Sequence, residues 1–138
     1  MNIEELREYC MSVKGASESF PFNETVLVFK VMDKMFVYVD LSPKDGQFKV
    51  NMKCDPEKSV ELREKYQGVQ QGIHTRSIMW NAVCLESDVP DKLIKELIEH
   101  SVEEVIKNLP KKKQEEYRKI VIYPKYPSGT KGIKMING

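Results

Sequence analysis

The chain has 138 residues, of which 41% are hydrophobic and 31% charged, and these proportions are typical of a single globular domain rather than a disordered chain. Its 22 basic and 21 acidic side chains give a net charge of +1, which argues against a protein that coats nucleic acid through bulk charge. No apolar run is long enough to span a membrane and the acidic N-terminus is unlike a signal peptide, so we expect a cytoplasmic protein.

The first part of the chain predicts one helix followed by three strands. Apolar side chains at spacings of three and four over residues 3–13 indicate an amphipathic helix that ends at Gly15. Residues 25–31 and 35–39 are rich in β-branched and aromatic side chains, and the short polar interruption between them predicts an antiparallel hairpin. Residues 47–53 alternate between polar and apolar side chains, which predicts a strand with a buried face and a polar face in water.

The middle of the chain predicts a helix, a loop and two strands. Residues 55–66 begin with Asp-Pro, a helix N-cap followed by the residue favoured at the first helical position. Glycines bracket a loop over residues 68–72. Residues 73–78 and 80–85 then indicate two further strands.

The strongest pattern is a wide apolar stripe over residues 90–109, which predicts a long helix that covers the sheet. Asp88 is placed to cap its start, and Pro110 ends it or begins a short turn over residues 111–117. Residues 120–123 offer a sixth strand that the following prolines interrupt.

The order α-β-β-β-α-β-β-α predicts an α+β domain, with an antiparallel sheet of about five strands backed by helices. The charge is unevenly distributed along this domain. Residues 107–138 hold nine basic and two acidic residues, a local charge of +7, which leaves 13 basic and 19 acidic residues, a charge of −6, for residues 1–106. The basic tail is suited to phosphates or an acidic partner, but such residues also complement a helix C-terminus and keep a tail soluble.

The chain lacks the sequence signatures of dinucleotide binding, of P-loop phosphate binding and of two common hydrolase schemes. Of the two histidines, His100 is expected as a surface or boundary residue of the long helix, whereas His74 begins a polar strand. Cys84 lies ten residues after His74, but no third catalytic partner is indicated. The acidic, histidine and cysteine spacings do not suit a metal site. We therefore expect no enzymatic activity, no metal and no cofactor.

Several stretches resemble the MmcQ/YjbR family of small bacterial proteins, in order as well as in content. They are Ile-Glu-Glu-Leu-Arg-Glu-Tyr-Cys at 3–10, Phe-Pro-Phe at 20–22, Val-Phe-Lys-Val at 28–31, Asn-Met-Lys-Cys-Asp-Pro at 51–56, His74, Trp80-Asn81, Val89-Pro90, Ser101 and Leu-Pro-Lys-Lys at 109–112. The resemblance covers residues 1–115, which we take as one domain, and leaves residues 116–138 as a basic C-terminal extension.

The resemblance implies a CyaY-like, frataxin-resembling fold and a double-wing mode of DNA binding. One departure concerns Met79, which stands where the family often has a histidine before the tryptophan, so a role for a histidine pair does not carry over. Frataxin-like iron binding does not carry over either, because a shared fold brings no ligands with it.

Two functions remain open at this point, and the resemblance favours the first. In the first, hairpin wings bind DNA and basic side chains contact its phosphates; the candidates are Lys30, Lys34, Lys49, Lys53, Arg76, Lys111 and Lys112. In the second, the chain binds a small molecule or a protein in a pocket around His74, Trp80 and Asn81, with Lys53 beside it. Trp80 is equally suited to anchoring the core. The first function requires that folding gathers the scattered basic residues on one side.

Overall fold

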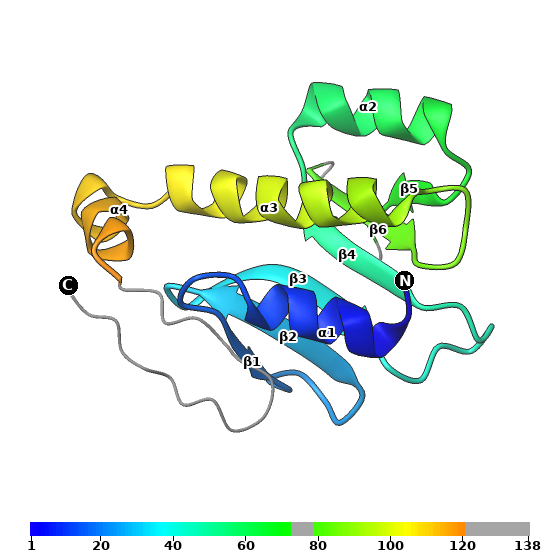
Figure 1. The fold of residues 1–138 in the computed structure, drawn as a ribbon, viewed down its shortest axis with the longest axis horizontal. Helices are drawn as coiled ribbons and strands as arrows, with labels where there is room; N and C mark the ends of the chain where they lie inside the picture. Colours follow the sequence, from blue (N-terminus) through cyan, green and yellow to red (C-terminus); the bar gives the residue numbers. More distant parts are fainter. Residues whose placement is uncertain (73–78, 121–138) are drawn as a thin grey trace.

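The computed structural model describes residues 1–72 and 79–120, and within these residues it contains four helices and six strands. The helices are α1 (Ile3–Met11), α2 (Pro56–Lys65), α3 (Asp91–Lys107) and α4 (Lys111–Arg118), and the strands are β1 (Ser17–Ser19), β2 (Val26–Val31), β3 (Lys34–Asp40), β4 (Lys49–Lys53), β5 (Val69–Gln71) and β6 (Trp80–Cys84). The strands form one antiparallel sheet in the order β1-β2-β3-β4-β6-β5 (Figure 1). The predicted α+β class is confirmed, with one strand more than expected.

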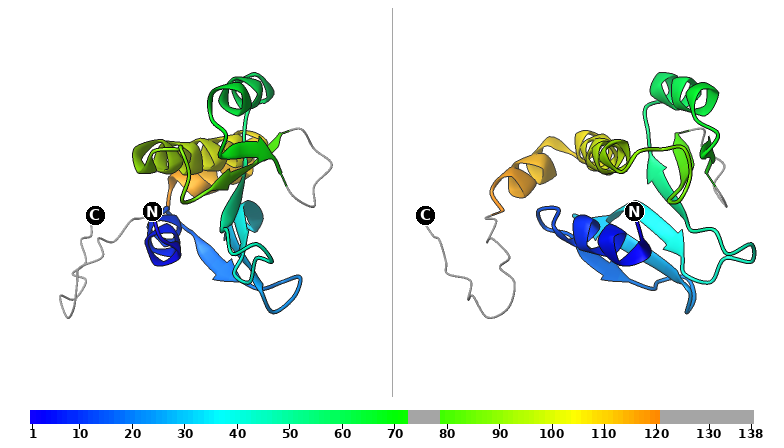
Figure 2. Two further views of the ribbon diagram at one scale, coloured as in Figure 1. Left: turned by 90° about the vertical axis from the view of Figure 1, so that its right-hand side faces the viewer. Right: turned by 45° about the vertical axis from the view of Figure 1, so that its right-hand side comes forward.

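Helices α1 and α3 lie on the same side of this sheet, as the nearly edge-on view in Figure 2 (left) shows. The long helix α3 crosses β3 and β4, and α2 contacts β5 at one edge of the sheet. No described helix covers the opposite side of the central strands (Figures 1 and 2). We call the two sides the core face and the open face.

The hydrophobic core fills the layer between the helices and the core face. Leu6 of α1 and Ile94 and Ile98 of α3 are fully buried there against Val37 of β3 and Val50 of β4. Burying each aliphatic side chain of this size contributes about 1.5–3 kcal/mol relative to leaving it in water. The apolar stripes of the two helices therefore hold them on the sheet, as their periodicity predicts.

The predicted hairpin is confirmed, with a two-residue turn between β2 and β3. Val31 pairs with Lys34, and the two residues between them, Met32 and Asp33, have φ angles of 49° and 63°. Left-handed backbone at both positions matches the twist of the flanking strands, which is why such turns favour residues that tolerate it. Lys34 thus belongs to β3 rather than to the turn.

One side chain of α3 links β3 to β4 where their regular pairing ends. The hydroxyl of Ser101, which is fully buried, donates to the carbonyl oxygen of Phe36 at 2.6 Å and accepts from the backbone N–H of Lys53 at 2.9 Å. The Ser101 hydroxyl therefore bridges the carbonyl oxygen of Phe36 and the N–H of Lys53, which do not hydrogen-bond to each other directly.

Asp88 does not cap α3, so that prediction is wrong. The N-cap residue of α3 is Pro90, and no side chain caps the helix there. The two carboxylate oxygens of Asp88 accept from the backbone N–H groups of Gln67 and Gly68, each at 2.8 Å. These two N–H donors precede β5 and have no strand partner of their own, so the carboxylate satisfies two donors at once. The two hydrogen bonds hold the pKa of Asp88 below its ordinary value, because they favour the charged carboxylate.

Two short strands differ from the prediction. β5 occupies residues 69–71, where a loop was predicted, and β1 occupies residues 17–19, where no element was predicted. Both are edge strands of three residues with few buried side chains, so they carry almost no hydrophobic signal. The strand predicted at 73–78, and residues 121–123 of the possible sixth strand, lie outside the described residues.

The boundary predicted after residue 115 falls inside α4. The hydroxyl of Tyr117 donates to the carbonyl oxygen of Lys14 at 2.9 Å, which ties α4 to the end of the α1 segment. Residues 116–120 therefore pack on the domain rather than extend from it. None of the described helices combines the length and apolar character needed to cross a bilayer.

Candidate functional site

The open face carries a groove of about 950 Å³, formed by strands β2, β3, β4 and β6 and by the loops before β2 and β4. We call it the open-face groove; it is lined by Phe22, Asn23, Val26, Met35, Tyr38, Asp40, Pro43, Lys44, Asp45, Gln47, Lys49, Asn51 and Trp80. Its position follows from the fold, because α1 and α3 occupy the other side of the same strands.

Two aromatic side chains form one wall of the groove. The ring centroids of Tyr38 on β3 and Trp80 on β6 lie 5.5 Å apart, with 44° between the ring planes. Tyr38 is only 9% exposed, and its burial raises the pKa of the phenol to about 12, so it stays neutral at physiological pH. Trp80 is half-buried and offers the remaining ring surface to the groove. Such a pair is suited to contact with a planar apolar ligand.

Strand β4 supplies the polar floor of the groove between these two aromatics. Its side chains alternate, so that Val50 and Met52 enter the core while Lys49 and Asn51 line the groove. The alternation was predicted. The expectation that the whole polar face lies in water is not met, because Asn51 is only 3% exposed. Asn51 lies directly opposite Tyr38 on β3 and Ala82 on β6. Its position between these two strands places Asn51 at the centre of the open face.

The charges at the loop end of the groove balance one another. Lys49 forms an ion pair with Asp45 at 2.9 Å. The backbone N–H of Gln47 and the Lys49 ammonium lower the pKa of Asp45 by favouring its charged form. Asp40 and Lys44 complete this end, with Asp40 accepting from the backbone N–H of Ser42 at 2.9 Å. Two carboxylates thus face two ammonium groups.

The predicted pocket residues do not come together. Trp80 lines the groove, but the next residue, Asn81, points to the core face, where its side-chain oxygen accepts from the Nε of Arg63 on α2 at 2.9 Å. Neighbouring side chains of a strand point to opposite faces, so the two cannot share one pocket. His74, the third predicted pocket residue, lies outside the described residues.

The predicted phosphate-binding residues are also divided between surfaces. Lys30 pairs with Met35, a groove residue, and Lys53 pairs with Trp80, so both lie on the open face beside Lys49. Lys34 pairs with Val31, a core residue, and therefore lies on the other side of the hairpin. Lys111 and Lys112 begin α4, which packs on α3 at the helical side (Figure 1). Arg76 lies outside the described residues.

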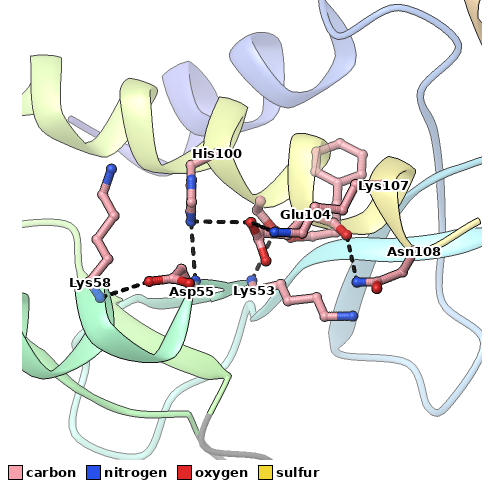
Figure 3. Close-up of polar contacts among 9 residues, drawn as sticks. Lys53, Asp55, Lys58, His100, Glu104, Lys107 and Asn108 are labelled. Atoms are coloured by element: carbon pink, nitrogen blue, oxygen red, sulfur yellow. Dashed lines mark hydrogen bonds and ion pairs between the residues drawn. The ribbon is translucent and has the colours of Figure 1, made fainter.

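A polar cluster around α3 was not predicted. The imidazole Nε2 of His100 accepts from the backbone N–H of Asp55 at 3.1 Å and lies 3.9 Å from a carboxylate oxygen of Glu104, which binds the ammonium of Lys107 at 2.9 Å (Figure 3). Asp55 is the N-cap of α2, so the cluster joins α3 to the start of α2. The spacing of four residues between His100 and Glu104 was the available signal. Glu104 is buried and its partners are in place, which is typical of a structural contact.

Cysteines and metal ligands offer no alternative site in the part of the chain that the structure describes. Cys10 and Cys54 are buried, Cys84 is partly exposed, and all three are free. Burial raises the pKa of the Cys10 thiol to about 12, which makes it unreactive. Within residues 1–72 and 79–120 no three histidine, cysteine or acidic side chains converge as metal ligands.

Comparisons with known proteins agree with the fold. The family model described as YjbR matches residues 11–103. The Escherichia coli K12 protein named "Uncharacterized protein YjbR" is 30% identical over 122 residues, which cover 88% of this chain and 98% of that protein. The E. coli O157:H7 protein named "Uncharacterized protein YbdF" is 29% identical over 99 residues, covering 72% of this chain and 80% of that protein.

Two solved structures share the fold. The crystal structure of the Deinococcus radiodurans protein DR2400, with the family-model domain DUF419, is 31% identical with a TM-score of 0.76, and the match covers 85% of this chain and 88% of that one. A Pseudomonas syringae protein is 24% identical with a TM-score of 0.63, covering 73% and 96%, which bears on the fold alone. The arrangement of helices on one face of the sheet is thus shared with solved relatives.

Proposed function

The chain belongs to the YjbR family, and we propose that within this fold it acts as a binding domain that holds a small molecule with a planar ring in the open-face groove. The observation that carries the proposal is the contact between Tyr38 and Trp80 in the wall of a groove on the open face of the sheet.

The size and lining of the groove support this proposal. Ligand sites typically enclose about 300–1,000 Å³ and combine apolar and aromatic walls with a few polar groups that fix orientation. The open-face groove, at about 950 Å³, lies in this range, and Asn51 and Gln47 supply amide groups among its apolar and aromatic side chains. Phe22, which is 66% exposed, adds a third aromatic side chain to the lining.

Trp80 is the only tryptophan of the chain, so its fluorescence reports directly on the groove. We expect planar heterocycles to change this fluorescence saturably. Calorimetry should show that Trp80→Leu weakens binding about 5- to 150-fold, the range that corresponds to about 1–3 kcal/mol for loss of one stacking platform. Val60→Ala, which removes exposed apolar surface from α2, is the matched control and should bind as the wild type does. Equal affinity in the Trp80 variant would contradict the proposal.

DNA binding is the second candidate, and the position of the β2–β3 hairpin favours it. This hairpin carries Lys30 and Lys34 on its two sides, so both sides offer an ammonium group for contact with a phosphate. The balanced charges at the loop end of the groove count against an extended phosphate-binding surface.

A salt titration tests the second candidate. The logarithm of the duplex association constant should fall linearly with the logarithm of salt concentration, with a slope of about −0.9 for each phosphate neutralised. A Lys30→Gln/Lys34→Gln double variant should bind more weakly and with a shallower slope. If duplex affinity is independent of salt, phosphate contacts are absent and the wing model fails.

A further inference from the structure

The end of the open face opposite the balanced loop end differs from it in charge. Lys30 pairs with Met35 across β2 and β3, and Lys53 pairs with Trp80 across β4 and β6. Ser101 holds the backbone of Phe36, the residue after Met35, level with the N–H of Lys53. The side chains of Lys30, Met35, Lys53 and Trp80 therefore form one row across four strands.

Both lysines of this row are without a carboxylate partner among the described residues. Each of the described ion pairs involves other side chains, and neither lysine has a further electrostatic contact. By contrast, the ammonium of Lys49 at the loop end is neutralised by Asp45. The loop end of the groove is thus electrically paired, whereas Lys30 and Lys53, which lie on the open face next to lining residues but outside the lining itself, have no carboxylate partner among the described residues.

These charges lie beside the aromatic wall. Cross-strand partners have Cβ atoms about 4.5–5.5 Å apart, so the side chain of Lys53 begins next to the indole of Trp80. Lys30 on β2 lies two strands away from Lys53 on β4, which is about 10 Å at the usual strand spacing. The two ammonium groups can therefore approach one anion from two sides. Two point charges suit a dianion, and lysine binds phosphate in this manner.

We propose that the ligand of the open-face groove is a heterocyclic compound carrying a phosphate group, with its ring against Trp80 and Tyr38 and its phosphate between Lys53 and Lys30. The proposal rests on the function proposed above and adds the chemical class of the ligand. It is distinct from DNA binding by hairpin wings, since it requires Lys30 and Lys53 but leaves Lys34, on the other side of the hairpin, without a role.

The test compares adenosine 5′-monophosphate with adenosine, using Trp80 fluorescence and calorimetry on the full chain. We expect the monophosphate to bind at least about tenfold more tightly than adenosine. Lys53→Gln and Lys30→Gln should each weaken monophosphate binding about tenfold, through loss of one charged contact, and leave adenosine binding unchanged. Lys34→Gln is the matched control and should alter neither affinity. Thermal unfolding midpoints establish that all three variants are folded.

Three other outcomes would overturn the proposal. Equal affinity for adenosine and its monophosphate would remove the phosphate site while leaving the groove as a binding site. Binding of uncharged heterocycles without any binding of the monophosphate would likewise exclude the phosphate site and leave the groove as a binding site. Weakening by Lys34→Gln equal to that by Lys53→Gln would indicate general charge attraction. Failure of every heterocycle to bind, in contrast, would overturn the proposed function itself.

Discussion

Ser101→Ala should destabilise the protein by about 2–4 kcal/mol, because it leaves two buried backbone groups without partners. The hydroxyl of Ser101 satisfies both the carbonyl oxygen of Phe36 and the N–H of Lys53, and the serine is fully buried, so water does not reach these groups from the helix side. Each unsatisfied buried group costs about 1–3 kcal/mol. Removing the hydroxyl of a solvent-exposed serine should cost far less.

Urea unfolding measures this difference, with Ser42→Ala as the control because Ser42 is exposed. The control should change the free energy of unfolding by less than about 0.5 kcal/mol. If Ser101→Ala were as stable as the control, Ser101 would not bridge β3 and β4 as described. Loss of the bridge should also disturb the row of residues at the lysine end of the groove.

Gly68→Ala should destabilise the protein by about 1–3 kcal/mol, the usual cost of forcing an extra methyl group into a packed position. A Cβ atom at Gly68 would lie 2.1 Å from the hydroxyl oxygen and 2.6 Å from the Cβ of Ser87. The hydroxyl can rotate away, but the Cβ of Ser87 moves only with its backbone. Gly68 cannot easily move away either, since its carbonyl oxygen accepts from the N–H of Cys84 and its N–H donates to the carboxylate of Asp88, each at 2.8 Å.

A compensating substitution makes this prediction specific. Ser87→Gly removes the two shortest contacts of a Cβ at position 68 and leaves the one with Asp88 Oδ1 at 3.1 Å, so in that background Gly68→Ala should cost clearly less than in the wild type. Chemical denaturation of the four proteins in this cycle gives the coupling free energy. Additive effects of the two substitutions would show that the clash with Ser87 is not the cause.

The elements predicted from the sequence with the correct type share a strong periodic signal. Residues 90–109 gave the long helix because eight apolar side chains repeat at helical spacing, and β4 followed from strict alternation. β1 and β5 could not be predicted in this way, because they are short edge strands whose pairing depends on β2 and β6. Asp88 accepts hydrogen bonds from the backbone N–H groups of residues 67 and 68, which lie about 20 positions earlier, so the sequence next to Asp88 does not indicate this role.

The candidate site was predicted in part. Trp80, one of the residues predicted around a pocket, lines the open-face groove, but Asn81 was placed beside it although strand alternation puts neighbouring residues on opposite faces. Tyr38 was missed for a different reason. Residues 35–39 are all apolar or aromatic, so no alternation distinguishes the groove side from the core side, and the register shift between Phe29 and Lys30 is not visible in the sequence.

The central claim is that the open face of the sheet, rather than the helical side, is the ligand-binding surface. Amide and indole chemical shifts in a ¹H–¹⁵N spectrum, recorded while adenosine 5′-monophosphate is added, test it most directly. We expect the perturbed signals to cluster at Tyr38, Asn51, Lys53 and Trp80, with the exposed side of α3 unchanged. Perturbations centred on α1, α3 or α4, with the Trp80 indole unmoved, would contradict the account.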